Sequence, residues 1–212
     1  YWNTVDPYSL DHLELIKSQG SVQYGSDAAG GTLNAFTKNA DFRGLADDRF
    51  FQNATVFLEY RANGEGSFVG RGEMEMGRGD RWGLHLGLTR KNYGDIEDSA
   101  VGRMRNTGYD EWDFDVRFDA LLGPDTAFTL VHQYVDQGDI WRWHSTVLNP
   151  GWTHEGHVAL PGRFQSRVYD QERSLIYARL TGTDLADNSF LDRWSATVSW
   201  QRQRDREFQD RS

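Results

Sequence analysis

The chain has 212 residues, no cysteine and a formal net charge of −9 at pH 7. The lack of cysteine excludes disulfide scaffolds and thiolate chemistry, and the negative charge argues against general nucleic-acid binding, which needs clustered Lys and Arg. No apolar run approaches the roughly 20 residues of a membrane helix, and the mean hydropathy is −0.72. Membrane β-strands need only about 10 residues with alternate apolar positions. The aromatic content is high for so polar a chain, 14% with 8 Trp. These rings could fill the core of a soluble β-sandwich or belong to membrane strands, so composition leaves both folds open.

The first unit is expected to cover residues 1–48 and to end in a short polar bridge. Leu13 and Leu15 stand between polar neighbours, as in a strand. Gly30 and Gly31 permit positive φ and close backbone approach, so they indicate a tight turn. A turn between two strands explains this pattern. A phosphate-binding loop does not, because neither G-x-x-x-x-G-K-[ST] nor a helix pattern is present.

Residues 10–38, LDHLELIKSQGSVQYGSDAAGGTLNAFTK, resemble the C-terminal part of the plug domain of TonB-dependent outer-membrane receptors. In that family the run reads as an Ile-Glu-Val-like strand, a Gly-Pro-Ala-Ser turn, Tyr-Gly, Gly-Gly and Asn-x-x-Thr-Lys. This chain departs from the pattern at residues 18–20, where Ser-Gln-Gly replaces Gly-Pro-Ala. The plug-like positions singled out are Glu14, Lys17, Tyr24, Gly25, Gly30, Gly31 and Asn34.

From Phe50 onward apolar and polar residues alternate with a period of two, which predicts strands bounded by turn residues. The clearest run, EWDFDVRFDALL, sets four apolar side chains against Asp113, Asp115, Arg117 and Asp119. In a wide barrel these charges would line a wet lumen and pair with a plug. The seven expected strands are about 54–62, 66–77, 82–93, 111–122, 127–135, 175–180 and 190–203.

After the first hairpin, short and long connections alternate. Residues 77–80 and 123–125 are expected to form tight turns, whereas 94–108 and 138–171 form long loops. Membrane barrels place tight turns at one rim and long loops at the other, and compact soluble domains rarely carry structureless loops above about 15 residues. The pattern favours a barrel, although a sandwich remains open.

The fold class predicted is therefore all-β: the end of a plug domain, residues 1–48, followed by about seven strands of a large antiparallel transmembrane β-barrel, residues 49–212. Tyr rather than Met at position 1 and a polar C-terminal run lead us to expect an internal piece of a longer chain.

The longest loop carries the candidate ligand-binding residues. Histidine can ligate haem iron, aromatic rings can stack on a macrocycle, and His-x-x-His spacing suits a transition metal. A solvated loop with idle histidines remains the alternative. Loop 94–108 is acidic but lacks the calcium spacing of an EF-hand. The ligand candidates are His144, His154, His157, Trp141, Trp143 and Trp152.

The resemblance implies a receptor of the bacterial outer membrane that actively takes up an iron complex, either a ferric siderophore or haem. It implies TonB with its inner-membrane energising partners and outer-membrane lipid as partners, a barrel of about 22 strands, no cofactor, no nucleic acid and no covalent catalysis. Glu14 and Lys17 become candidates for plug-to-wall ion pairs. Two later runs, YVDQGDIWRWH and FLDRWSATVSWQRQRDRE, resemble the haem-uptake branch.

Three other functions stay open at this point. A passive porin or adhesin would share the alternating strands and loop asymmetry, but it has no reason to carry the plug-like run. A soluble carbohydrate-binding β-sandwich would explain the many Trp residues. A β-sheet hydrolase lacks an identifiable nucleophile in this sequence.

Overall fold

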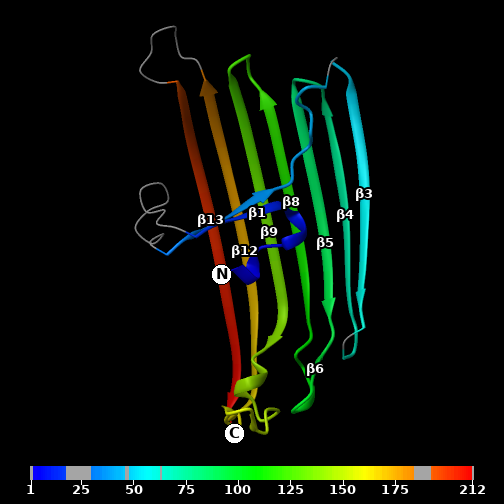
Figure 1. Cartoon of the computed structure of the whole chain (residues 1–212), viewed down its shortest axis with the longest axis vertical. Coiled ribbons are helices and arrows are strands. Elements are labelled where there is room, and N and C mark those ends of the chain that lie inside the picture. The colour runs from blue at the N-terminus through cyan, green and yellow to red at the C-terminus, as the bar shows by residue number, and fades with distance from the viewer. Residues whose placement is uncertain (1, 18–29, 46–47, 63, 184–191, 212) are drawn as a thin grey trace.

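The computed structural model describes residues 2–17, 30–45, 48–62, 64–183 and 192–211. Seven strands form one antiparallel sheet, here the main sheet, in which strands that follow one another along the chain are paired side by side (Figure 1). The predicted all-β, antiparallel class is confirmed. The strands of the main sheet are β3 (Phe50–Arg61), β4 (Ser67–Arg78), β5 (Trp82–Tyr93), β8 (Tyr109–Leu121), β9 (Thr126–Trp141), β12 (Phe164–Thr183) and β13 (Arg193–Arg211).

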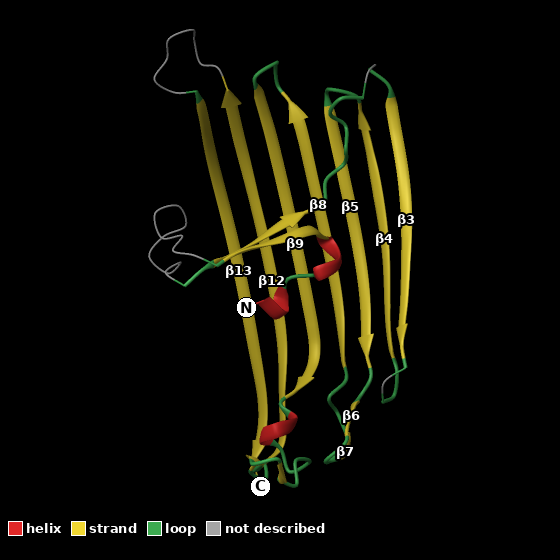
Figure 2. Ribbon diagram, in the orientation of Figure 1, coloured by secondary structure: helices red, strands yellow, loops and turns green. Residues whose placement is uncertain are grey.

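The connections at the two ends of the main sheet differ in length. Tight turns join β4 to β5 and β8 to β9 at one end, while the long connections gather at the other (Figure 2). The first long connection contains the hairpin β6 (Ile96–Asp98) and β7 (Gly102–Met104); the second contains η4 (Trp143–Ser145) and the hairpin β10 (Trp152–His154) and β11 (His157–Ala159).

The loop predicted at 138–171 is too long. β9 continues to Trp141 and β12 begins at Phe164, so the connection covers 142–163. Pairing continues past the apolar stretch because backbone hydrogen bonds need no hydrophobic alternation, and Val168 lies opposite Trp141. The remaining loop is fixed by its own bonds: Asn149 Nδ2 donates to the carbonyl oxygens of His144 (3.0 Å) and Leu160 (2.9 Å).

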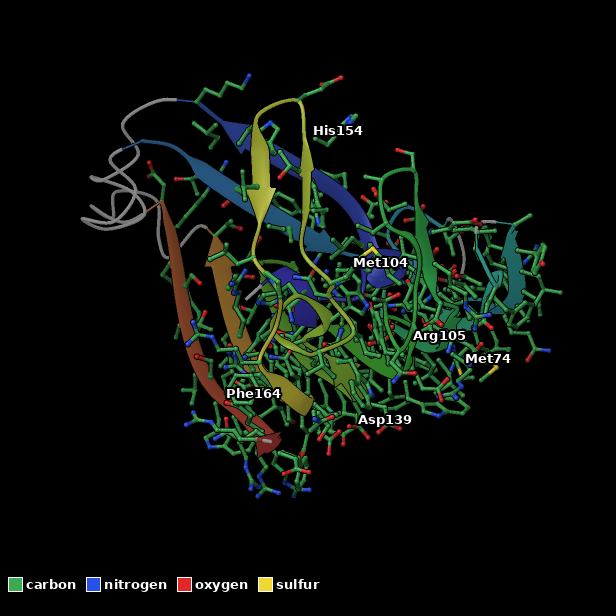
Figure 3. All side chains as sticks on the ribbon, turned by 90° about the horizontal axis from the view of Figure 1, so that it is seen from below. Met74, Met104, Arg105, Asp139, His154 and Phe164 are labelled. Carbon is green, nitrogen blue, oxygen red and sulfur yellow. The ribbon has the colours of Figure 1, made fainter. Side chains whose placement is uncertain are left out.

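The chain before β3 forms a separate unit on the concave side of the main sheet (Figures 1 and 3). We call its described residues, 2–17 and 30–45, the N-terminal segment. Asp6 caps η2 by accepting from Tyr8 N at 3.1 Å, and Pro7 fits the first helical position. Its elements are η1 (Trp2–Thr4), η2 (Pro7–Ser9), β1 (Leu10–Ile16) and β2 (Thr32–Thr37), with β1 and β2 paired antiparallel.

A short anchor fixes the end of the N-terminal segment to the main sheet. Phe42 is 2% exposed and its ring lies over Gly83, where a Cβ would approach the ring to 2.6 Å. The backbone N–H of Asp80 donates to Phe42 O at 3.0 Å. The absence of a side chain at Gly83 therefore makes room for the Phe42 ring, which explains a glycine in the interior of a strand.

Successive side chains of a strand alternate between faces, so the main sheet has an inward face toward the N-terminal segment and an outward face. The outward face is apolar and exposed: Leu58 is 67% and Val198 78% exposed. Other exposed apolar residues on this face are Val56, Phe68, Met74, Leu88, Phe114, Leu130, Ile176 and Trp200. In the described ranges, no helix is long and apolar enough to span a membrane.

The inward face is polar and buried, which inverts the usual pattern of a globular sheet. Arg71 is 3%, Lys91 2% and Asp113 1% exposed. Buried charges are costly unless they are paired and hydrogen-bonded. The contacts of these charges therefore define the candidate site.

Candidate functional site

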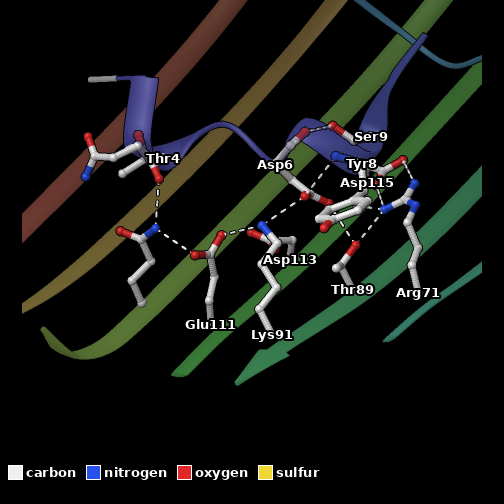
Figure 4. Close-up of polar contacts among 12 residues, drawn as sticks. Thr4, Asp6, Tyr8, Ser9, Arg71, Thr89, Lys91, Glu111, Asp113 and Asp115 are labelled. Carbon is white, nitrogen blue, oxygen red and sulfur yellow. Dashed lines mark hydrogen bonds and ion pairs between the residues drawn. The ribbon is translucent and has the colours of Figure 1, made fainter. Parts of the chain in front are cut away.

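The candidate site is the interface between the N-terminal segment and the inward face of the main sheet (Figure 4). Lys91 of β5 forms its centre. Its Nζ lies 2.9 Å from Asp6 Oδ1, 2.6 Å from Glu111 Oε1 and 2.8 Å from Asp113 Oδ2. The antiparallel register sets Glu111 opposite Lys91 on β8. One ammonium group thus balances three carboxylates, one of which belongs to the N-terminal segment.

Arg71 of β4 makes the second buried link to Asp6. Its Nη1 lies 2.8 Å from Asp115 Oδ1 and 3.3 Å from Asp6 Oδ2, and its Nε donates to Glu73 at 2.6 Å. The Thr89 hydroxyl donates to Asp6 Oδ2 at 2.8 Å. Asp6 is therefore held by two cations and a hydroxyl from two neighbouring strands.

Gly87 of β5 makes room for this arrangement. A Cβ at this position would lie 2.6 Å from both Arg71 Cζ and Asp115 Oδ1. Real Cβ atoms do not approach other heavy atoms so closely, so any larger residue would displace the ion pair. The two inward glycines of β5, Gly83 and Gly87, therefore shape the surface on which the N-terminal segment rests.

Further bonds join the N-terminal segment to strands on both sides of β5. Arg117 Nη1 donates to Thr37 O at 3.3 Å, as expected for an inward charge of β8. The remaining bonds are Gln137 Nε2 to Asn3 O (2.7 Å), Arg173 Nη1 to Thr4 O (3.3 Å), Lys38 Nζ to Glu73 Oε1 (2.6 Å) and Tyr8 Oη to Glu59 Oε2 (2.7 Å). Burial and the bond to Glu59 raise the pKa of Tyr8 to about 12, so this hydroxyl stays protonated and can donate well above neutral pH.

His85 is a buried imidazole in the same interface. It is fully buried, and its Nδ1 lies 3.4 Å from Asp115 Oδ2. Neither ring nitrogen makes a hydrogen bond of good geometry within the described residues. His85 lies opposite Arg117 of β8, so its side chain is on the inward face.

A pocket of about 310 Å³ opens between the N-terminal segment and the ends of β5 and β8 that lead into the first long loop. The rings of Tyr93 and Tyr109 are in contact there, with centroids 4.8 Å apart and planes tilted by 41°. Val5, Pro7, Leu10 and Leu13 supply an apolar wall, with Lys91 and Glu111 at the base. An apolar, aromatic pocket with a few polar groups is the usual form of a small-molecule site.

The plug-like residues are only partly within the described ranges. Tyr24 and Gly25 lie outside them. Gly31 has φ +147°, and a Cβ there would lie 2.7 Å from Ile16 O, so the glycine is required. Gly30 directly precedes it, and Asn34 pairs with Glu14 across β1 and β2.

Glu14 and Lys17 do not reach the main sheet in the described part of the chain. The nearest basic group to Glu14 is His12, 3.8 Å away on the same strand, and Glu14 is 51% exposed. Lys17 is exposed. The ion pairs with the sheet come instead from Asp6 and Lys38, on either side of the strands on which we expected them.

The loop residues proposed to bind a ligand lie on three elements: the end of β9, η4 and the β10–β11 hairpin. Trp141 is the last residue of β9. Trp143, in η4, is buried and only 6% exposed. His154 and His157 face each other across the tip of the β10–β11 hairpin, which Trp152 begins, and His144 is exposed in η4. Figure 3 shows this hairpin turned toward the concave side. Among the described residues, no three His, Cys, Asp or Glu side chains are grouped to hold a metal.

The shorter of the two long loops is fixed around one carboxylate. Asp95 accepts from the backbone N–H groups of Thr107 (2.9 Å) and Gly108 (3.1 Å) and from Arg103, which also pairs with Glu65. Burial alone would raise the pKa of Asp95, but these donors together hold it below its usual value. The conformation of this loop is therefore held by specific hydrogen bonds, and it lies at the same end of the sheet as the pocket.

Sequence reasoning missed Asp6, Arg71 and Lys91, the residues that carry the interface. The alternation did place Asp113 and Asp115 on the inward face, and the structure confirms that position. Comparison with known proteins adds nothing further: no family model, no curated protein and no solved structure matches this chain.

Proposed function

We propose that this chain forms the end of the plug and the first wall strands of a TonB-dependent receptor in a bacterial outer membrane, one that takes up an iron complex. The observation that carries the proposal is the separate N-terminal segment, packed by buried charges against the polar concave face of an antiparallel meander. A plugged barrel needs this arrangement, because a wet lumen tolerates charge on the wall and a plug must pair with it.

The outward face supports a membrane location. On β8 the apolar run extends from Trp112 to Ala120, eight residue steps, or about 27 Å along the strand. A tilt of about 35–45° would reduce this to a height of roughly 20 Å, close to the apolar band of about 25 Å in membrane barrels. Trp112 at one end and Trp82 near the other match the aromatic girdles that flank such a band.

The two outer strands of the main sheet support continuation into further strands. β3 and β13 each pair on one side only within the described residues. β13 runs for 19 residues, and a free edge of that length is a template for pairing that soluble proteins avoid. Additional strands that close the sheet would satisfy both edges.

The site geometry suggests how transport would be gated. Moving the N-terminal segment requires that Asp6 leave Lys91 and Arg71, all three of which are buried. Breaking buried pairs of this kind costs several kcal/mol. Thermal fluctuation would rarely supply it, so the gate would stay closed until TonB transmits proton-motive energy. The Tyr93–Tyr109 pocket, near the long loops, is where the iron complex would rest before this step.

The three other functions account for less of the molecule. A passive porin or adhesin gives no role to an ion-paired segment inside the sheet. A soluble carbohydrate-binding sandwich needs a second layer over its apolar face, and within the described residues that face is uncovered. The structure contributes no observation that favours a hydrolase.

The test is uptake of radiolabelled iron by the native host, with and without the complete gene. We expect uptake to depend on the gene and to stop when a protonophore collapses the proton gradient or when TonB is deleted. Uptake that persists without the gradient would support the passive barrel and refute the proposal. Recovery of the protein in the soluble fraction, without detergent, would support the sandwich.

The cargo can be narrowed by titrating the purified full-length protein with haem. A variant with alanine at His144, His154 and His157 serves as the comparison. A saturable Soret shift that the variant loses would place haem in the longer loop, whereas a retained shift would move the haem site elsewhere. No shift in either protein would leave ferric siderophores as the cargo class.

A further inference from the structure

The Tyr93–Tyr109 pocket combines two kinds of lining. Its walls are apolar or aromatic, whereas its base is formed by Lys91 and Glu111. Its volume of about 310 Å³ is at the lower end of the range for small-molecule sites, so it suits one arm of a larger ligand. The charge at the base then decides which kind of arm is favoured.

The base of the pocket holds more carboxylates than its ammonium group can neutralise. Lys91 Nζ lies 2.9 Å from Asp6, 2.6 Å from Glu111 and 2.8 Å from Asp113, and all four side chains are buried (Figure 4). Buried charges are screened much less than charges in water. A cation in the pocket would therefore relieve the repulsion among these carboxylates, and an anion would add to it.

Neighbouring charges do not remove this excess. The pairs Arg71–Asp115 and Lys38–Glu73 each contain one charge of either sign. Arg173 lines a small cavity on the other side of the carboxylates and offsets one of them at most. The surroundings of the pocket base therefore still favour a cation.

The two tyrosine rings favour the same kind of group. The face of an aromatic ring is negative and attracts a cation within about 6 Å of its centroid. The rings of Tyr93 and Tyr109 lie 4.8 Å apart, so a group that enters the pocket meets both residues. Aromatic cages recognise alkylated ammonium ligands in this way.

The first long loop, at the same end of the sheet, has an excess of the same sign. Arg103 there is shared between the carboxylates of Asp95 and Glu65. A cleft lined by one sign of charge concentrates ligands of the opposite sign. The approach to the pocket and its base thus select for the same ligand charge.

Resting on the receptor function proposed above, we propose that the Tyr93–Tyr109 pocket binds the protonated alkylamine arm of a ferric siderophore. The apolar wall contacts the methylene groups of the arm, the tyrosine rings contact its ammonium group, and the carboxylates at the base attract it. An arm that ends in a carboxylate is repelled at the same position.

The test uses the full-length protein in detergent and three forms of one ferric hydroxamate complex. The forms differ only at the end of one arm, which carries a free primary amine, an N-acetyl group or an N-succinyl group. The arm is cationic, neutral or anionic, respectively, at neutral pH. In fluorescence titrations we expect the amine form to bind about tenfold more tightly than the acetyl form, and the succinyl form to bind most weakly.

Two pairs of variants locate the cation. Tyr93→Leu removes an aromatic face and should abolish most of the preference for the amine form, whereas Tyr93→Phe keeps the face and should retain the preference. Glu111→Gln removes one carboxylate with little change in shape and should lower the preference. Its control, Glu155→Gln, removes the same charge from a side chain that is 82% exposed on the β10–β11 hairpin, and should behave as wild type.

The three forms of the complex decide the inference on the wild-type protein alone, even if a variant disturbs docking of the N-terminal segment. Equal binding of the three forms, tightest binding of the succinyl form or no binding of any form would overturn it. A preference for the amine form that survives both Tyr93→Leu and Glu111→Gln would place the cation elsewhere and also refute it. The proposed receptor function fails separately, when iron uptake by the host depends on neither the gene nor TonB.

Discussion

Replacing Lys91 by methionine tests whether buried charge holds the N-terminal segment in place. Methionine keeps most of the side-chain volume and removes the ammonium group that balances Asp6, Glu111 and Asp113 at 2.9, 2.6 and 2.8 Å. Removing one partner of a buried pair costs about 3–5 kcal/mol, because the remaining charge stays buried without compensation. Undocking of the segment would return all three carboxylates to water. The free-energy cost of the substitution therefore destabilises the docked state relative to the undocked state.

Hydrogen–deuterium exchange of the full-length protein measures this docking. A loss of about 3–5 kcal/mol would speed exchange in η2 and β1 by roughly two to four orders of magnitude, provided that exchange requires undocking. Strands that do not contact Asp6, such as β13, are expected to exchange at the wild-type rate. The perturbation would then be local to the segment rather than a general loss of stability.

The matched control is Lys38→Met, which removes a lysine from the same interface. Lys38 is 34% exposed, and its partner Glu73 keeps a second cation in Arg71. A partly exposed pair contributes about 1 kcal/mol or less, so exchange should rise about fivefold at most. If Lys91→Met and Lys38→Met had equal effects, the buried network would not be what holds the segment.

Three other substitutions test separate parts of the molecule. Gly87→Ala forces a Cβ against Arg71 and Asp115, and should cost about 1–3 kcal/mol of unfolding free energy in guanidinium titrations. Asp95→Asn should speed exchange in the loop after β5. Because the folded pKa of Asp95 is depressed, the wild-type loop should stay protected above about pH 4, the unfolded value, and lose protection as pH falls below it. Val198→Arg places a charge at the middle of the outward face and should reduce outer-membrane assembly, at a cost of about 2–4 kcal/mol.

Each of these has a control in a neighbouring position. Gly72→Ala meets nothing within 4 Å and should change the unfolding free energy by less than about 0.5 kcal/mol. Glu97→Gln, in the same loop as Asp95 but exposed, should leave the acid response intact. Ser199→Arg lies next to Val198 on the opposite face and should assemble normally. Equal assembly of both arginine variants would mean that the outward face does not contact lipid.

The strands of the main sheet were predictable because one of their faces is apolar. Alternation of apolar and polar residues located six of the strands, the run at 66–77 being Gly-rich and poorly defined, and turn residues located the tight connections. The last strand was expected to end at 203, but β13 continues to Arg211. The prediction failed where that contrast disappears. On β12 the outward residues Ser166, Asp170 and Glu172 are polar, so the alternation is lost although pairing with β13 continues to Phe164. A strand that extends beyond the apolar band therefore looks like a loop in the sequence.

The candidate site was predictable only in outline. Alternation indicates which face a charged residue occupies, so Asp113 and Asp115 could be placed on the inward face. It does not indicate which residue will pair with them, because the partners arrive from another strand and from the N-terminal segment. Asp6 lies 85 positions before Lys91 in the chain, and their pairing depends on how the segment crosses the sheet. Long-range pairs of this kind carry no local signal.

Glu14 and Lys17 show that charge and position in the sequence alone do not identify the residues that pair with the sheet. Their charge and their position in the plug-like run made them candidates for contact with the sheet, yet Glu14 is half exposed and Lys17 faces solvent. β1 crosses the concave side as an exposed strand, and the short helical turn before it descends to the inward face. Asp6 thus has two structural roles. It caps η2 by accepting a hydrogen bond from Tyr8 N, and it forms ion pairs with Lys91 and Arg71 that hold this turn on the sheet. A substitution such as Asp6→Ala would remove both at once, which is why Lys91 gives the cleaner test of the interface.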